Sequence, residues 1–465
     1  MLKAKRIVAA VIALTFAICL LCSCKSTENS LPSAIYAGNK LYYTFSKDDF
    51  SESTKQLDEK VIVKDNWFAD SLLSSLSEGL AKAKNLSEEE ALKEIFNGGY
   101  KIYATVNPNI QNAAEKVFAD SATFEQREGY PYAQSAAVIM DYSGRVLAVT
   151  GGGDGDRTLN RATRITRQPG SAIKPLTVYS RAVMDNSINY SSLIFNKPLI
   201  IQSLNGATPW PKYDDTVGAE VTTVQALARS VNTCAVQVAQ NYTAEDTVEF
   251  LQNDLGFSTI VTNQSENDLS LSATALGYLT KGAYLYELCA AYQMFGNGGK
   301  YFEPIFYTKI EDRNGNVIIN KTQKENIVLD SQTATIMNRL LKEVIESDEG
   351  TGKPAELKGI EAFGKTGTTT DKHFVGGTPE YLGAVYTGYD DGTDVSVGYT
   401  KSPTLIWKKI FEELELTKTT FELDNSVITK KFCSASGGLA TNKCTKTEIG
   451  YYKTTALPTI CALHK

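Results

Sequence analysis

Hydrophobic residues along this chain recur either at helical spacing or in short runs bounded by turn residues. Helical spacing predicts helices over residues 67–83, 107–118, 222–240, 285–296, 331–347 and 404–414. Alternating or continuous apolar runs predict strands over residues 41–45, 100–106, 135–140, 145–150, 361–369, 381–389 and 395–400. Strands from the two ends of the main body therefore bracket a mainly helical middle.

This order of elements predicts an α+β fold, in which early and late strands close one antiparallel sheet and helices cover its faces. Two helix starts carry clear local signals. Ser87 and Glu90 match a capping box, and Asn107 followed by Pro108 is typical of a helix N-cap and its first residue. No internal repeat interrupts the pattern.

The N-terminus has the features of an export signal. Basic residues precede an apolar run over residues 7–21, which is shorter than the roughly 20 residues of a membrane span. The run ends in Leu-Cys-Ser-Cys, which resembles the lipobox of bacterial lipoproteins, where the final cysteine, here Cys24, is acylated. An uncleaved anchor is the alternative, because Cys22 is unusual in that motif. Both interpretations place the remaining chain outside the cytoplasm, tethered to a membrane.

Charge and histidine content exclude several classes of function. The chain has 465 residues, enough for two or three domains, and its net charge is -6. Without a long basic run, we expect no nucleic-acid partner. The only histidines are His373 and His464, the second one residue from the C-terminus. Metal catalysis lacks its commonest ligand, so we predict no metal and no cofactor.

The eight cysteines form three groups. Three belong to the leader, and Cys234 and Cys289 lie in apolar helical patterns, where we predict inert core thiols. The others cluster in the tail, where an exported chain is expected to form one disulfide and keep one thiol: Cys433, Cys444 and Cys461. Their pairing stays open. With His464 they also make a Cys3His set, but its spacing matches no common zinc site, so zinc is the minor alternative.

A serine and a lysine stand three residues apart in 167-RQPGSAIKPLTVYS-180. On a helix they share a face, and Pro169-Gly170 would place Ser171 at the helix N-terminus, where free amides favour an oxyanion. A buried lysine near a second positive charge loses its proton more readily, so Lys174 is a candidate base for a Ser171 nucleophile. Alone, the pair equally fits a helix cap and a surface lysine.

Two further motifs follow in order: Ser230-Val231-Asn232, expected inside a helix, and Lys365-Thr366-Gly367-Thr368, on a late strand. Together, Ser-x-x-Lys, Ser-x-Asn and Lys-Thr-Gly resemble the signature of penicillin-binding proteins and serine β-lactamases. The resemblance to the transpeptidase half of class A penicillin-binding proteins runs from about residue 65 to 415 and includes residues 102–115, 160–175, 216–232, 350–355 and 364–391.

Two departures from the family pattern matter. His373 stands where the family usually has Trp, which we expect to alter the rim of the site. Class A members also carry a glycosyltransferase domain first, and too little chain lies between Cys24 and Gly99 to hold one. We therefore predict a monofunctional chain with four parts: a leader or anchor (1–24), a linker and small helical connector (25–98), a transpeptidase domain (99–415) and a cysteine-containing tail (416–465).

The resemblance implies a catalytic role for five residues. Ser171 would be the nucleophile and Lys174 its base. Ser230 would relay a proton to the leaving amine, Asn232 would hold the peptide side of the substrate, and Lys365 would support the relay electrostatically.

The resemblance also implies how substrate is bound and which fold carries the site. Thr366, Gly367 and Thr368 would bind the terminal carboxylate, and the amides of Ser171 and Thr368 would form an oxyanion hole. The fold would be the penicillin-binding/β-lactamase-like transpeptidase fold, with a mostly helical subdomain beside the sheet.

The function that follows is D,D-transpeptidation of peptidoglycan at the extracytoplasmic face of the bacterial cytoplasmic membrane. A D-Ala-D-Ala stem peptide or a β-lactam would acylate Ser171, an acceptor amine would resolve the ester, and a separate glycosyltransferase is the expected partner. With water as acceptor, the protein would be a D,D-carboxypeptidase. A non-catalytic β-lactam sensor or scaffold is the alternative from another class. The sequence leaves the acceptor and the physiological role open.

Overall fold

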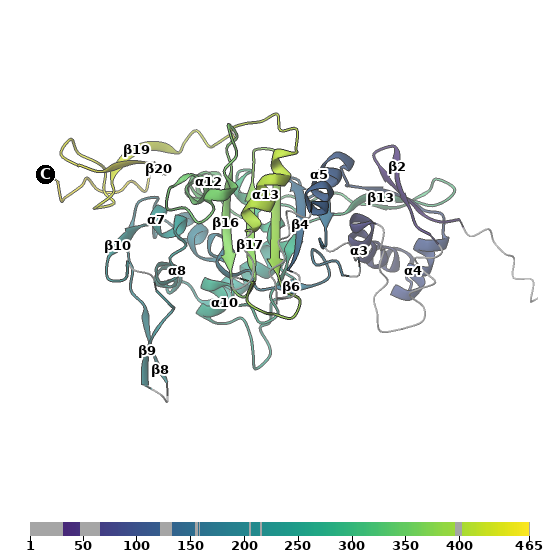
Figure 1. Cartoon of the computed structure of the whole chain (residues 1–465), viewed down its shortest axis with the longest axis horizontal. Coiled ribbons are helices and arrows are strands. Elements are labelled where there is room, and N and C mark those ends of the chain that lie inside the picture. The colour runs from purple at the N-terminus through teal and green to yellow at the C-terminus, as the bar shows by residue number, and fades with distance from the viewer. Residues whose placement is uncertain are drawn as a thin grey trace, which may run out of the picture.

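A five-stranded antiparallel sheet lies at the centre of the computed structural model, which describes residues 31–46, 66–120, 133–153, 157, 159–203, 206–213, 216–395 and 402–464. Its strands lie side by side in this order (Figure 1): β16 (Phe363–Thr368), β17 (Lys372–Gly377), β18 (Tyr381–Gly388), β4 (Gln134–Asp141) and β5 (Val146–Thr150). Early strand β4 pairs directly with late strand β18. The predicted α+β arrangement, with one sheet closed by both ends of the domain, is confirmed.

Helices from most of the chain's length lie around this sheet, some packed directly on it and others packed on those helices. They are α5 (Pro108–Ala119), α6 (Ser180–Met184), α7 (Thr223–Ala228), α8 (Asn232–Ala239), α9 (Ala244–Glu249), α10 (Leu271–Leu276), α11 (Leu285–Ala291), α12 (Ser331–Glu346) and α13 (Pro403–Glu412). Short two-stranded sheets lie between these helices. They pair β6 (Thr166–Arg167) with β11 (Ala283–Tyr284), β7 (Leu193–Phe195) with β10 (Glu220–Thr222), β8 (Leu199–Ser203) with β9 (Gly206–Trp210), and β12 (Lys300–Tyr301) with β15 (Asn326–Ile327).

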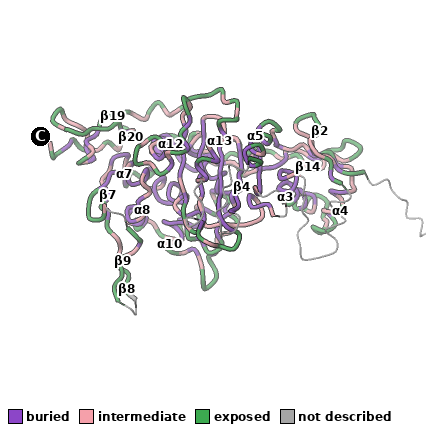
Figure 2. The backbone as a smooth tube through the Cα atoms, in the orientation of Figure 1, coloured by how far each residue is buried: buried purple, intermediate pink, exposed green. Residues whose placement is uncertain are grey.

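Both faces of the central sheet are buried. Side chains alternate across a strand, and in β4 Ala137 and Ile139 join the core cluster that contains Trp407 of α13. The alternate residues Ala136 and Val138 join the larger cluster on the other face. Figure 2 shows this buried backbone running through the middle of the molecule. Burial on both faces explains why β4 is a continuous apolar run rather than an alternating one.

A second five-stranded sheet lies beside the first, in the order β14 (Val317–Asn320), β13 (Tyr307–Glu311), β3 (Lys101–Ala104), β1 (Ala34–Ala37) and β2 (Lys40–Thr44). Helices α3 (Trp67–Lys84) and α4 (Glu88–Asn97) belong to the same end of the molecule (Figure 1). The boundary predicted at residue 98 therefore runs through this sheet, because β1 pairs with β3 across it. The connector and the residues that follow share one structural unit.

A buried ion pair fastens α3 to the segment that leads into the Ser-x-x-Lys motif. Arg164 contacts Asp70 with two nitrogens, at 2.5 and 2.9 Å, and Asn160 donates to the same carboxylate at 3.0 Å. Asp70 is 1% exposed. Removing one partner of a buried pair leaves an uncompensated charge, so replacing Asp70 or Arg164 alone should destabilise the contact between the connector and the main body.

The C-terminal tail forms a hairpin of β19 (Ile428–Cys433) and β20 (Thr447–Tyr452), which docks on the helical part (Figure 1). The Tyr190 ring packs edge-on against Phe432 and Tyr452, both fully buried. The Ser191 hydroxyl donates to the Gly437 carbonyl at 2.6 Å and accepts from the Tyr452 hydroxyl at 2.8 Å. The tail is thus an ordered part of the fold.

Most predicted elements are present, and two differences are informative. The capping box of Ser87 and Glu90 and the Asn107 cap form as expected. The helix predicted over 222–240 is broken at Ser230 into α7 and α8. Strand β17 is missing from the prediction, because its polar His373 and its terminal glycines hide the apolar run. The strand predicted at 395–400 lies almost entirely outside the described residues.

The expectations for the cysteines and for the membrane anchor have different outcomes. Cys433, Cys444 and Cys461 are free thiols, so the disulfide expected in the tail does not form in the structure. Cys234 and Cys289 are fully buried, as predicted for core thiols. No helix within the described residues is long and apolar enough to cross a membrane. The leader and Cys24 lie outside those residues.

Candidate active site

The Ser-x-x-Lys motif lies on a tight helical turn that is pressed against strand β16. Gly170 to Ile173 form a 3-10 helix, in which residues three apart eclipse one another, so Ser171 and Lys174 lie on the same side. Gly170 has a φ of +55°, and a Cβ there would lie 2.9 Å from the Thr368 carbonyl oxygen and 3.0 Å from its amide nitrogen. Glycine therefore permits both the turn and its close approach to β16.

The Lys174 amine is the point at which the first two motifs meet. Its Nζ donates to the Ser230 carbonyl and to Asn232 Oδ1, both at 2.7 Å, and lies 3.4 Å from Ser230 Oγ. The side chain is fully buried. Lys174 is thus enclosed between the helix that carries it and the turn that carries Ser230.

Ser230 occupies a strained backbone position that ends helix α7. Its amide bonds Leu227 and the Val231 amide bonds Ala226, which together make the Schellman pattern of a helix C-terminus. That pattern requires a left-handed residue, usually glycine, and Ser230 has a φ of +59°. The sequence places a hydroxyl where glycine would be more stable, which is characteristic of a functional site.

Strand β16 brings the third motif to the same place. Lys365 is fully buried, with Nζ 3.1 Å from the Thr366 carbonyl, whereas Thr366 and Thr368 are more exposed. A Cβ at Gly367 would lie only 2.2 Å from the Pro169 carbonyl oxygen. Only glycine therefore allows β16 to lie so close to the turn that bears Ser171.

Burial changes the protonation of both lysines. It lowers the pKa of Lys174 well below its ordinary value, and the positive charge of Lys365 lowers it further. Burial also lowers the pKa of Lys365 to about 7. These directions agree with the effect of burial and like charge expected from the sequence, and they favour a neutral amine at Lys174.

The motif residues surround an open cleft of about 750 Å³. Six of the predicted site residues line it: Ser171, Ser230, Asn232, Thr366, Gly367 and Thr368. Lys174 and Lys365 are buried behind this surface, so the structure brings all eight predicted residues to one site. None of the described residues that line the cleft carries a carboxylate, but two of them, Lys212 and Lys372, carry an amine. The cleft therefore suits an anionic ligand.

His373 lies at the edge of the cleft and is almost entirely buried, with 3% exposed. It pairs with Gly367 across β16 and β17, and its ring centroid is 5.4 Å from that of Tyr386. Burial and then the charge of Arg167 lower the pKa of His373 to about 3. The ring is therefore neutral at ordinary pH, and its position fits the predicted place beside the Lys-Thr-Gly strand.

Several cleft residues lie outside the three motifs. The Thr351 hydroxyl is 2.7 Å from that of Thr366, so it orients a residue predicted to bind the carboxylate. Thr351 lies in segment 350–355, which is part of the family resemblance, so the sequence offered a signal for placing it at the site. Lys212 and Tyr278 also line the cleft. No local pattern in the sequence distinguishes these two from ordinary surface residues.

Comparison with known families agrees with this geometry. Residues 135–399 match the penicillin binding protein transpeptidase domain. The chain belongs to this family. Among curated members, penicillin-binding protein 1A of Clostridium perfringens is 31% identical over 82% of this chain and 48% of its own length. Penicillin-binding protein 1F of Bacillus subtilis is 30% identical over 72% of this chain and 46% of its own length. The chain spans about half the length of the curated relatives it matches.

Solved structures of penicillin-binding proteins share the fold. Penicillin-binding protein 1A from Haemophilus influenzae is 19% identical, with a TM-score of 0.67 over 84% of this chain and 77% of that one. The D,D-transpeptidase domain of a peptidoglycan glycosyltransferase from Eggerthella lenta is also 19% identical, with a TM-score of 0.56 over 83% and 98% of the two chains. The expected transpeptidase fold is thereby confirmed.

Proposed function

We propose that this penicillin-binding protein is a D,D-transpeptidase that acts through an ester of Ser171. The observation that carries the proposal is the Lys174 amine, buried beside Ser171 and hydrogen-bonded to both Ser230 and Asn232. Stem peptides ending in D-Ala-D-Ala are the proposed donor, and β-lactams the proposed inhibitors, in keeping with the family.

Lys174 is the proposed base for the first step. A charged lysine has three N–H donors and no lone pair, whereas a neutral amine has two donors and one lone pair. The Ser230 carbonyl and Asn232 Oδ1 use two donors. A neutral Lys174 thus keeps its lone pair for the Ser171 proton. His373 is not the proposed base, because a pKa of about 3 makes its ring a poor proton acceptor.

The Ser171 oxygen then attacks the carbonyl carbon of the penultimate D-Ala. The oxyanion that forms is stabilised by the amides of Ser171 and Thr368, each worth about 3 kcal/mol in comparable sites. As the C–N bond breaks, the Ser230 hydroxyl gives its proton to the departing D-Ala amine and takes up the proton held by Lys174, with buried Lys365 supporting the relay. An acceptor amine then gives a proton to Lys174 and attacks the ester carbonyl. The ester C–O bond breaks as the new peptide bond forms, and Lys174 returns the proton to Ser171.

The chemistry of the cleft supports recognition of a terminal carboxylate. The hydroxyls of Thr366 and Thr368 face a cleft also lined by Lys372 and Lys212. A D-Ala-D-Ala peptide and a penicillin share that carboxylate next to the reacting carbonyl, so one arrangement accepts both. Asn232 is the proposed contact on the peptide side.

The cellular setting completes the proposal. Lipidation of Cys24, or an uncleaved anchor over residues 1–24, would tether the protein to the outer face of the cytoplasmic membrane. Glycan polymerisation would then be supplied by a separate glycosyltransferase.

Two measurements on the purified full chain test the proposed function. Labelling with a fluorescent penicillin, followed by digestion and mass spectrometry, should place the adduct on Ser171, and Ser171→Ala should not label. With an N-acylated D-Ala-D-Ala peptide and a D-amino acid acceptor, the exchanged peptide should form. Release of D-Ala with only the hydrolysed product would instead identify a carboxypeptidase. An adduct on Ser171 without turnover would identify a non-catalytic β-lactam sensor, and absence of both would leave a scaffold.

A further inference from the structure

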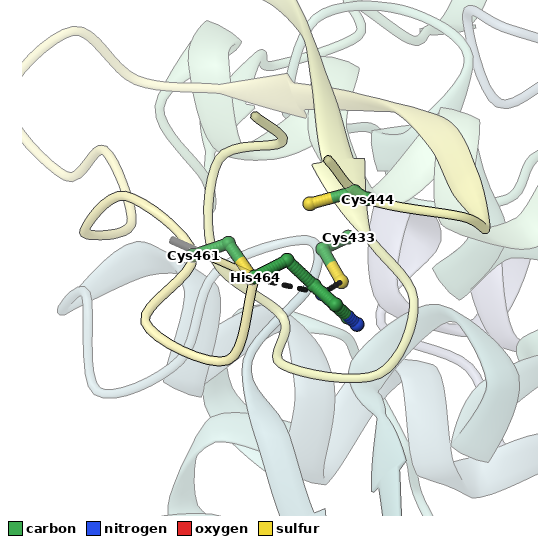
Figure 3. Close-up of side chains that lie close together, drawn as sticks. All are labelled: Cys433, Cys444, Cys461 and His464. Atoms are coloured by element: carbon green, nitrogen blue, oxygen red, sulfur yellow. Dashed lines mark hydrogen bonds between the residues drawn. The ribbon is translucent and has the colours of Figure 1, made fainter. Parts of the chain in front are cut away.

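Three cysteines and a histidine from three separate segments converge at the end of the tail. Cys433 ends β19, Cys444 lies in the loop before β20, and Cys461 and His464 belong to the last segment. Their side-chain ligand atoms all lie within 4.8 Å of one another. Figure 3 shows the four side chains gathered in one place, with the imidazole beside Cys433 and Cys461.

The backbone explains this convergence. Leu439 forms one bridge with Phe432 and another with Ile460, the residues that immediately precede Cys433 and Cys461. The Cys433 amide bonds the Gly438 carbonyl and the Cys461 amide bonds the Leu439 carbonyl, each at 2.8 Å. The segments around Cys433, Leu439 and Cys461 are therefore held side by side by backbone hydrogen bonds, which brings the two cysteines together.

The distances fit a tetrahedral metal centre. His464 Nδ1 lies 3.4 Å from the sulfurs of both Cys433 and Cys461. Around Zn²⁺, with Zn–S bonds of about 2.3 Å and Zn–N bonds of about 2.0–2.1 Å, ligand atoms lie roughly 3.5–3.8 Å apart. The four atoms therefore need only a small adjustment to bind one ion.

The surroundings of the sulfurs also fit thiolate ligands. The Thr441 amide donates to Cys444 Sγ at 3.3 Å, and the Thr441 hydroxyl donates to the His464 carbonyl at 2.7 Å. Such outer contacts orient metal ligands. A tetrahedral set of three thiolates and one imidazole favours zinc over the other common metals. A disulfide would use two sulfurs and would give no role to the imidazole between them.

We infer that Cys433, Cys444, Cys461 and His464 bind one structural Zn²⁺ ion that holds the tail closed. The set has no position left open for water, as in other structural zinc sites. A segment as short as residues 416–465 buries little core of its own, and metals often supply the missing stability. This inference replaces the expectation of a disulfide and no metal, and it is independent of the chemistry at Ser171.

The metal content of the purified full chain tests the inference. Protein prepared without chelator should retain one equivalent of zinc after dialysis, measured by elemental analysis. Replacing zinc with Co²⁺ should give visible d–d bands of a tetrahedral centre and a sulfur-to-cobalt charge-transfer band in the near ultraviolet. Cys444→Ser and His464→Ala should each lose at least half of the retained zinc and weaken the charge-transfer band or shift the d–d bands.

A matched control separates ligand loss from general damage. Cys289→Ala removes a thiol that is fully buried in α11, away from the tail, and should keep the zinc and the cobalt spectrum. His464 is partly exposed near the C-terminus, so His464→Ala should leave the circular dichroism of the main body unchanged. All variants keep the leader cysteines, so any metal bound there cancels in the comparison.

Two outcomes would overturn the inference. One is equal zinc content in the wild type, Cys444→Ser and His464→Ala. The other is a disulfide between any two of the three tail cysteines, found by peptide mapping of the protein as purified.

Discussion

The candidate active-site cleft gathers side chains from distant parts of the chain and the Cys3His cluster gathers them from three segments of the tail, and the two sites are held together differently. At the cleft, Lys174 and Lys365 are fully buried, and the glycines at 170 and 367 let the Ser171 turn pack directly on β16. In the tail, Cys444 and His464 remain partly exposed on irregular segments. Packing of the core fixes the first site, whereas in the second the inferred ion would hold the ligands that packing leaves exposed.

The two sites illustrate two ways of stabilising a group of polar side chains: hydrogen-bond acceptors already in place, or a bound metal ion. A buried amine without partners is costly, so the cleft needs acceptors already in place, and Ser230 and Asn232 provide them. In the tail, Cys433 and Cys461 are buried and the bridges of Leu439 bring their segments together, whereas the inferred ion would fix the partly exposed Cys444 and His464. The cleft should therefore be sensitive to changes in side-chain chemistry, and the tail to removal of the metal.

The largest expected effect comes from replacing the base. Lys174→Arg keeps a positive charge but cannot supply a neutral nitrogen at any usable pH. Loss of general-base catalysis typically costs 10²–10⁴-fold, so the rate of penicillin acylation should fall by about 10³-fold or more. Stopped-flow or gel-based labelling under single-turnover conditions measures it.

A half-buried lysine outside the cleft gives the control. Burial lowers the pKa of Lys321 as well, but its ammonium lies over the Tyr307 ring, 4.1 Å from the centroid, outside the cleft. Lys321→Arg should acylate at the wild-type rate. Equal losses in both variants would mean that arginine disturbs the fold and that Lys174 has no special role.

Removing zinc should affect the tail strongly and the cleft little. With a chelator present, the amides of Cys461 and Leu439, both hydrogen-bonded within the tail, should exchange with solvent about tenfold faster or more. Acylation of Ser171 should change by less than about twofold, because the core that shapes the cleft does not depend on the ion. Hydrogen exchange and labelling rates on the same sample measure the two effects.

Re-adding Zn²⁺ should restore slow exchange in the tail, while Mg²⁺ should not. A parallel loss of acylation and of tail protection would show that the two regions are coupled, contrary to the separation proposed here.

The smallest effect concerns the backbone at Ser230. Ser230→Gly and Ser230→Ala both remove the hydroxyl, so both should slow acylation to a similar extent. Glycine accepts the left-handed φ and alanine does not, so the glycine variant should be more stable by about 1 kcal/mol. Chemical denaturation gives this difference. An alanine variant as stable as the glycine variant would argue against strain at this position.

The sequence predicted those parts of the molecule whose geometry is local. Ser171 and Lys174 lie within one helical turn, and Lys365 to Thr368 lie on one strand. Their spacing alone therefore determines which side chains share a face of the turn or of the strand. The Asn107 cap and the apolar run of β4 formed where the pattern placed them. Their assembly into one cleft could be expected only through the family resemblance, since nothing local brings Ser230 to Lys174.

Features that depend on loops or on unusual backbone were not predictable. Ser230 gave no sign of ending a helix, because glycine is the usual residue at a left-handed cap. Strand β17 is short of apolar residues, and its pairing with β16 and β18 decides its structure. The Cys3His set is visible in the sequence, but its spacing matches no common zinc site, and only the fold shows that the four ligand atoms lie within 4.8 Å of one another.

The central claim is that a neutral lysine activates Ser171, and the pH dependence of β-lactam acylation tests it most directly. Only the neutral form of Lys174 accepts a proton, so the rate should rise with pH through its lowered pKa. Lys365→Met removes the nearby like charge while keeping a side chain of similar length. The pKa of Lys174 should then move upward, and the rising limb should shift to higher pH.

His373→Ala should leave the limb where it is, because His373, with a pKa of about 3, is neutral throughout the range. The account predicts a limb that shifts in Lys365→Met, persists in His373→Ala and disappears with the activity in Lys174→Arg. A limb that persists in Lys174→Arg, or one that is lost in His373→Ala, would contradict it.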